Sequence, residues 1–370
     1  MNENNDLIQY PRKVFVRRTL TLMGKFLLWL LARVQVVGKD QLPKRGPIIL
    51  AGNHIAAVEA VMMAAYTPGL VEFFGNGDIP FDPNYAWIAK AYDLIPINRG
   101  NLDRKGLQMA LHVLKQNGIL GIFPEGGTWN PAQMEAQTGI AWLSYKAQAP
   151  ILPIGFGGTK EAIGNALKLK RPKLIMHVGN LIPPVTIENK RLSLKENLQL
   201  SANHILSEIK TLIPEEDVQA FQRRADEEFD LEIEFLSLDG EVIDADIHIE
   251  HGAAYARLLY TPNLLDVLVR NLGLPIQPIK FVYKRSDISP LLKAWESISD
   301  YLEVNPGFFT YRFGVDEGLG VKQSLVELQE IGKRVQDLKC ALTINPIRHY
   351  RNTATGAQVN ERGGCFPDSL

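Results

Sequence analysis

The sequence predicts an α/β protein with a mostly parallel sheet flanked by helices, an N-terminal membrane-surface helix before it and a second, smaller α+β domain after it. Three observations indicate this organisation. Apolar runs of strand length alternate with helix-forming segments as far as residue 213, acidic residues dominate directly after Pro214, and a period-two alternation follows. The 370 residues are enough for two domains, each with its own hydrophobic core.

Residues 1–45 predict a helical segment that associates with a membrane. Residues 26–32 are strongly apolar, but this run is shorter than the roughly 20 residues that a spanning helix needs. No small-residue cleavage site of a secretory signal follows it. An apolar helix with basic flanks can lie in a membrane interface, with its cations among anionic headgroups; the alternative is a helix packed on its own domain. The flanking cations are Arg12, Lys13, Arg17, Arg18, Lys25 and Arg33.

Residues 46–213 predict the α/β domain. In chain order, we expect strands at residues 47–52, 71–75, 94–97, 119–123, 151–156 and 174–178. We expect helices at residues 56–65, 87–92, 104–116, 139–147 and 194–213. Because the strands are apolar on both faces and alternate with helices, the sheet should be buried between two helical layers.

Residues 214–345 predict the α+β domain, whose role the sequence does not indicate. Two alternating runs, at residues 231–238 and 242–249, surround Asp239-Gly240, a pair that favours a tight hairpin turn. Further strands are expected at residues 279–283, 307–314 and 340–344, and helices at residues 253–271, 289–301 and 322–338. Residues 346–370 are polar and lack periodicity, which predicts a disordered tail.

The composition narrows the class of partner. The formal net charge of −1 indicates no general affinity for nucleic acid. Neither Cys340 nor Cys365 has a second thiol at metal-ligand spacing, so a reducing compartment is expected. A group in the second domain superficially resembles a metal site, but the solvated face of a hairpin explains it better, and we predict no metal. This group contains Asp244, Asp246, His248, Glu250 and His251.

Asn53, His54 and Glu59 follow the expected strand at residues 47–52. Ligands of open α/β sheets bind in the crevice beyond the strand ends. A neutral imidazole at this point can take a proton from a hydroxyl, and a carboxylate about one helical turn further on can orient it. Asn53 can serve as a helix cap or a hydrogen-bond donor. By itself the pair is weak, because a loop histidine beside an unrelated glutamate has the same spacing.

A second group of polar residues follows two other expected strands. Glu125 comes after the strand at residues 119–123, and the small residues Gly126, Gly127 and Thr128 allow backbone amides to approach an anion or polar ligand. Arg99 follows the strand at residues 94–97 and offers a guanidinium for phosphate or carboxylate. A plain turn and a surface ion pair are the simpler explanations for each feature alone.

Together these segments resemble the glycerolipid acyltransferase family, which includes the 1-acylglycerol-3-phosphate acyltransferases. The resemblance extends over roughly residues 34–213 and rests on four blocks in the order that the family has. The blocks are Asn53-His54-x4-Glu59, Ile97-Asn98-Arg99-Gly100, Phe123-Pro124-Glu125-Gly126 and Ile151-Leu152-Pro153-Ile154.

The resemblance implies an enzyme that transfers a fatty acyl group to the hydroxyl of a lysophospholipid, foremost lysophosphatidic acid. His54 would be the general base, Glu59 would orient it, and Arg99 would bind the acceptor phosphate. Glu125 and Gly126 would shape the acceptor site, beside Gly127 and Thr128. The donor would be acyl-CoA or acyl carrier protein as co-substrate, with no cofactor and no metal. The enzyme would work on the membrane surface, at the cytoplasmic face, as a peripheral or monotopic protein.

Two departures from the family pattern keep alternatives open. Glu59 stands where the family usually has aspartate, and Gly127-Thr128-Trp129 stands where the family often has a threonine and an arginine. Lys105 or Lys160 could replace that arginine. Another lipid acceptor, or a degenerate relative that binds lipid without catalysis, therefore remains an alternative.

Overall fold

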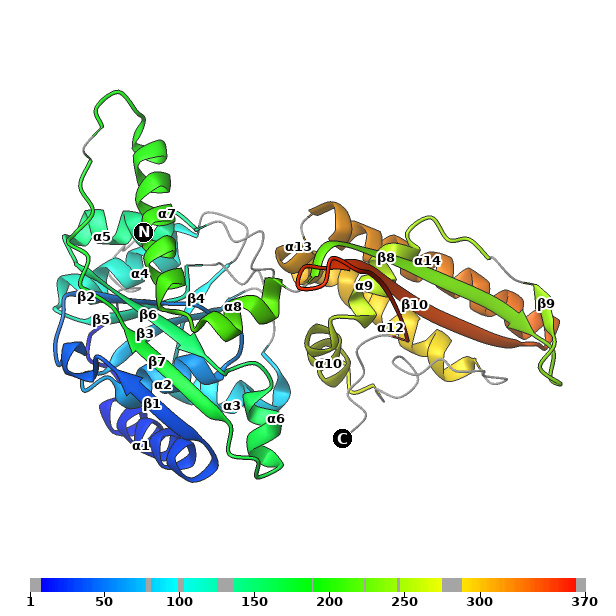
Figure 1. Cartoon of the computed structure of the whole chain (residues 1–370), viewed down its shortest axis with the longest axis horizontal. Coiled ribbons are helices and arrows are strands. Elements are labelled where there is room, and N and C mark those ends of the chain that lie inside the picture. The colour runs from blue at the N-terminus through cyan, green and yellow to red at the C-terminus, as the bar shows by residue number, and fades with distance from the viewer. Residues whose placement is uncertain are drawn as a thin grey trace, which may run out of the picture. The chain divides into compact units, whose positions relative to one another are not determined.

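The computed structural model places the chain in two compact units (Figure 1). Unit 1 is Met1–Gly77 with Trp87–Phe221, and unit 2 is Asp78–Ala86 with Gln222–Leu370. Within them the structure describes residues 8–77, 81–98, 103–124, 136–187, 189–222, 224–244, 247–274, 288–313 and 315–363.

Unit 1 is built on a seven-stranded sheet with the order β1-β7-β6-β2-β5-β3-β4. Strands β2 to β6 are parallel, β7 is antiparallel to β6, and β1 is parallel to β7. The predicted α/β class with a mostly parallel sheet is therefore confirmed. The strands are β1 Arg33–Val37, β2 Ile48–Gly52, β3 Val71–Asn76, β4 Ile95–Ile97, β5 Ile119–Ile122, β6 Ile151–Gly157 and β7 Lys173–Val178.

Helices cover both faces of this sheet, because its central strands are apolar on both sides (Figure 1). One hydrophobic core joins the sheet to α4, α5 and α7, and the other joins it to α1 and α2. The helices of unit 1 are α1 Val14–Leu31, η2 Lys39–Gln41, α2 Val58–Tyr66, α3 Pro83–Tyr92, α4 Arg104–Lys115, α5 Gly139–Ala147, α6 Ala162–Leu167, α7 Leu194–Leu212 and α8 Glu215–Gln222. The first four residues of α3 and the last residue of α8 are counted with unit 2.

One edge of the unit 1 sheet collects the ends of its parallel strands. We call it the carboxyl edge: β2, β5 and β6 end there at Gly52, Ile122 and Gly157. The starts of β7 and β1 lie at the same edge, because β7 runs against β6 and Arg33 is in register with Lys173. Loops after β2, β5 and β6 therefore meet there with the loops before β1 and β7.

The N-terminal segment is held to unit 1 by a buried ion pair. Arg17 of α1 and Glu72 of β3 are both 0% exposed and bonded to each other. The Arg17 guanidinium also donates to the backbone oxygens of Tyr92 at 2.8 Å and Asp93 at 3.0 Å, and Arg12 lies 3.0 Å from the same carboxylate. The expectation that Arg17 lies among headgroups is therefore wrong, because its charge is used to neutralise a buried acid.

Replacing Arg17 with alanine is expected to destabilise unit 1 by about 3 kcal/mol, because the buried Glu72 carboxylate would lose its closest cation. Urea unfolding should show a lower midpoint with an unchanged slope. The matched control is Arg18→Ala, an exposed position on the same helix, with an expected change within about 0.5 kcal/mol. Equal effects of the two substitutions would contradict the importance of the pair.

Unit 2 packs helices against an antiparallel sheet with the order β11-β10-β8-β9. The strands are β8 Arg224–Leu236, β9 Val242–Asp244, β10 Ala341–Asn352 and β11 Gln358–Arg362. The helices are α9 Gly252–Leu259, α10 Pro262–Asn271, α12 Ser289–Val304, α13 Gly307–Phe313 and α14 Val315–Leu338. The hairpin predicted around Asp239-Gly240 is confirmed by the pairing of β8 with β9.

Three sequence predictions for unit 2 need comment. Residues 307–313 form a helix, not the predicted strand, because Phe308 and Phe309 are consecutive and both buried in the core, whereas a strand points neighbours to opposite faces. The helix predicted over residues 253–271 is two helices, with Pro262 opening the second one. The strand predicted at residues 279–283 lies outside the described residues.

The disordered tail predicted for residues 346–370 is wrong for residues 346–363. Strand β10 continues to Asn352 along β8, and β11 returns along β10. Besides the backbone pairing, their side chains form ion pairs, including Arg348 with Glu361 and Arg351 with Asp226, and they lack an alternation of apolar residues. The polar sequence therefore conceals two strands.

Candidate active site

His54 and Glu59 lie at the carboxyl edge, between the end of β2 and the first turn of α2. His54 Nδ1 is 3.2 Å from Glu59 Oε2. The Glu59 side chain is 0% exposed, whereas that of His54 is 24% exposed. The structure thus brings together the two residues that the sequence predicts as a pair, with the carboxylate buried and the imidazole reachable from solvent.

Glu59 is stabilised by the start of the helix that carries it. Its carboxylate accepts the backbone N–H of Ala56 at 2.8 and 3.0 Å and that of Ile55 at 3.3 Å. These two N–H groups lie in the turn before the N-cap residue Ala57, and Glu59 itself is in the first turn of α2, where the helix dipole favours an anion. The same carboxylate faces His54 Nδ1, which favours the tautomer with a proton on Nδ1 and the lone pair on Nε2.

Phe123 fixes the plane of the imidazole. It follows β5, the neighbour of β2, and its ring stacks on that of His54 with centroids 4.3 Å apart and an interplanar angle of 22°. No local sequence pattern indicates a role for this ring. Its position at the end of a strand next to β2 could have indicated the contact, but recognising that neighbour requires the strand order of the folded sheet.

Asn53 joins two strands beyond the end of their ladder. Its side-chain amide donates to the backbone oxygen of Phe156 at 3.1 Å, and its carbonyl oxygen accepts the Phe156 N–H at 2.7 Å. The residue is 1% exposed. Asn53 is therefore a clamp between β2 and β6 and not the helix cap that the sequence suggests, since the N-cap of α2 is Ala57. Its role in substrate binding stays a prediction.

A base with an orienting carboxylate, on an open α/β sheet, can remove a proton from a bound hydroxyl. Residues 33–157, which contain this pair, match the family model described as Acyltransferase. Unit 1 carries an acyltransferase domain. The chain is thus an acyltransferase enzyme, and its mostly parallel sheet holds the domain's histidine at a strand end.

Relatives of the acyltransferase domain are distant in sequence. The 1-acyl-sn-glycerol-3-phosphate acyltransferase of Bacillus subtilis (strain 168) is 24% identical over 200 residues, 51% of this chain and 92% of that protein. A probable enzyme of the same name from Mycoplasma pneumoniae is 22% identical over 171 residues, 45% of this chain and 64% of that protein. The solved 1-acyl-sn-glycerophosphate (LPA) acyltransferase PlsC from Thermotoga maritima is 19% identical, with a TM-score of 0.40 over 55% of this chain and 84% of that one.

The remaining residues that the sequence predicts for the site lie outside the described parts of the chain. These residues are Arg99, Glu125, Gly126, Gly127 and Thr128, and their roles stay predictions. The two lysines considered as substitutes for an arginine are described: Lys105 is in the first turn of α4, after β4, and Lys160 follows β6. Both therefore lie at the carboxyl edge, as His54 does.

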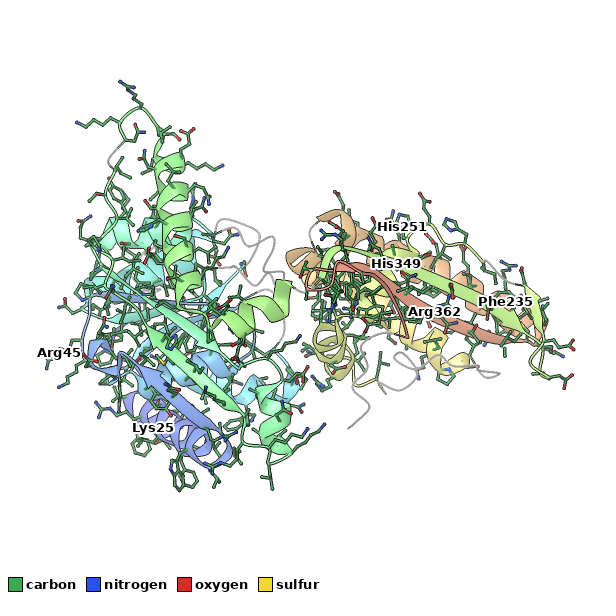
Figure 2. All side chains as sticks on the ribbon, in the orientation of Figure 1. Lys25, Arg45, Phe235, His251, His349 and Arg362 are labelled. Atoms are coloured by element: carbon green, nitrogen blue, oxygen red, sulfur yellow. The ribbon has the colours of Figure 1, made fainter. Side chains whose placement is uncertain are left out.

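Unit 2 contains one group of metal-ligand type among its described residues. Ligand atoms of Glu250, His251 and Glu327 lie within 4.8 Å of one another. His251 Nδ1 is 2.7 Å from Glu327 Oε1, which joins the start of α9 to α14 (His251 is labelled in Figure 2). Of the residues grouped with His251 by the sequence, Asp246 lies outside the described part. The contact is an ordinary histidine–carboxylate pair, and we assign no metal to it.

Proposed function

We propose that this enzyme transfers a fatty acyl group from an acyl thioester to lysophosphatidic acid and so forms phosphatidic acid. The observation that carries the proposal is His54, held 3.2 Å from a fully buried carboxylate within the acyltransferase domain. The choice of acceptor is supported by the relatives, which are named 1-acyl-sn-glycerol-3-phosphate acyltransferases.

In the proposed reaction, His54 Nε2 takes the proton of the acceptor hydroxyl as its oxygen attacks the thioester carbonyl. The tetrahedral intermediate collapses by breaking the carbon–sulfur bond, and the imidazolium returns its proton to the thiolate. Glu59 stabilises the transient imidazolium through Nδ1, and the Ala56 N–H keeps the carboxylate in place. Acyl-CoA or acyl carrier protein would supply the thioester, without a covalent acyl-enzyme.

The proposed acceptor and product are amphiphiles, so we also propose that the enzyme works on the membrane surface, at the cytoplasmic face. Helix α1 supports this: Phe15, Leu22, Phe26 and Trp29 are exposed along it. Lys25 extends from the same helix and lies 5.7 Å from the centroid of the Tyr66 ring (Figure 2). None of the helices within the described ranges is long and apolar enough to cross a membrane.

The test is a panel of lysolipid acceptors incubated with the purified full chain and a radiolabelled acyl group carried on CoA or on acyl carrier protein. We expect phosphatidic acid as the main product, with lysophosphatidic acid used at least about tenfold faster than uncharged or zwitterionic acceptors, because the phosphate supplies binding energy. Lipid mass spectrometry identifies the product. Preference for a glycolipid or another lysolipid would overturn the choice of acceptor, and no acylated product from any acceptor would overturn the proposal.

A further inference from the structure

A short turn at the carboxyl edge exposes two leucines between basic residues. Leu167 ends α6 with 73% exposure, and Leu169 follows with 74%. Lys168, Lys170 and Arg171 alternate with them. The order apolar-basic-apolar-basic-basic on an exposed turn is not explained by packing within unit 1, since neither leucine belongs to a hydrophobic core.

The backbone of this turn is held in a defined shape. The N–H of Leu169 donates to Ala166 O at 2.9 Å, and that of Lys170 donates to Asn165 O at 2.9 Å. Leu169 adopts φ 57°, a left-handed conformation that leucine rarely adopts. A residue with a Cβ is strained at such a φ, so folding alone does not favour leucine at this position.

The turn is joined to the C-terminal end of α1. Arg171 Nη2 donates to the backbone oxygen of Trp29 at 3.2 Å, and Arg33 Nε donates to that of Arg171 at 3.2 Å. Trp29 itself is 66% exposed, and its ring centroid is 5.9 Å from that of Phe26. The two leucines and the two aromatic rings therefore belong to neighbouring segments of one surface.

This surface lies at the edge of the sheet that carries the catalytic histidine. Gly157 of β6 is in register with Ile175 of β7, so the turn before β7 is level with the end of β6. Gly52 of β2 is in register with Ile154 of β6, and His54 comes two residues later. A membrane against the turn would therefore contact the same edge from which His54 is reached.

We propose that residues 167–171 form a second membrane contact, with Leu167 and Leu169 inserted among the lipids of an anionic bilayer and Lys170 and Arg171 at its phosphates. The occupant is a bilayer and not a protein because exposed leucines interleaved with cations match the two layers of an anionic leaflet, apolar chains below negative headgroups. Because the turn is bonded to the end of α1, the protein would contact the bilayer at two places, and two contacts orient the carboxyl edge toward the lipid. This inference rests on the proposed action at a membrane surface.

A fluorescent label at position 169 tests the contact directly. The variant Leu169→Cys, in a Cys365→Ser background, carries an environment-sensitive dye; Cys340 is buried. With vesicles of phosphatidylglycerol and phosphatidylcholine, we expect a blue shift and quenching by lipids that carry a quencher in the acyl chain. Leu200→Cys, an exposed leucine of α7, is the matched control and should show neither.

A second measurement uses vesicle sedimentation of the full chain. The variant Leu167→Gln/Leu169→Gln should bind anionic vesicles about tenfold more weakly than the natural chain, whereas Leu200→Gln/Leu238→Gln should bind equally well. Vesicle binding by the natural chain with the label at 169 remaining in water would overturn this inference and leave the acyl transfer proposal intact. If the lipids quench the label but no acceptor is acylated, the acyl transfer proposal is overturned and the membrane contact stands. If the natural chain is a dimer and the double variant is a monomer, the surface binds a second copy of the chain, and the inference is also overturned.

Discussion

Replacing His54 with alanine is expected to lower kcat/KM for acyl transfer by about 10³-fold, within the range by which general bases accelerate reactions. The substitution removes the lone pair that takes the acceptor proton. It should leave the fold intact, because Glu59 keeps its hydrogen bonds from the backbone of Ile55 and Ala56. Release of the free thiol from acyl-CoA, followed with a thiol-reactive dye, measures the rate.

The matched control is His204→Ala, an exposed histidine on α7 far along the chain from the pair. Its rate should equal that of the natural enzyme. The unfolding midpoint of His54→Ala should also stay close to that of the natural chain, which separates loss of the base from loss of the fold. Unchanged turnover in a folded His54→Ala enzyme would contradict the role of His54 as base.

Replacing Glu59 with aspartate is expected to lower kcat by about 10²-fold, because displacement of a catalytic group by about 1 Å has effects of this size. In this structure the Glu59 carboxylate reaches both the Ala56 N–H and His54 Nδ1. A side chain shorter by one methylene cannot keep both contacts on the same backbone. The KM for the acceptor should change little, because Glu59 is buried and acts through His54.

Two comparisons sharpen this result. Glu216→Asp, an exposed position in the first turn of α8, is the control for the same chemical change and should leave the rate unaltered. Glu59→Gln keeps the length but removes the charge, and it should lower kcat as well, because a neutral amide stabilises the imidazolium poorly. A gain in rate for Glu59→Asp would contradict the fit and would mean that glutamate compromises the natural site.

Much of unit 1 could be predicted from the sequence, because its strands are continuous apolar runs and its helices have regular starts. Helix α7, for example, begins with a capping box formed by Ser193 and Glu196. Strand β1 was missed, since it is a half-exposed edge strand whose partner β7 lies more than 130 residues further along the chain. Strand β11 was missed for a different reason: it forms a local hairpin with β10, but four of its five residues are polar and show no apolar alternation.

For the site, the sequence alone determined the His54–Glu59 pair, because a spacing of five residues across a helix start makes the contact local. It also indicated the acyltransferase class, because the four motif blocks can be read directly from the sequence. Only the tertiary structure decided that Asn53 clamps β6, that Phe123 stacks on the imidazole, and that Arg17 is buried against Glu72. These contacts join segments separated by 55 to 103 residues or by a strand crossover, and such contacts depend on strand order and burial, which no local pattern encodes.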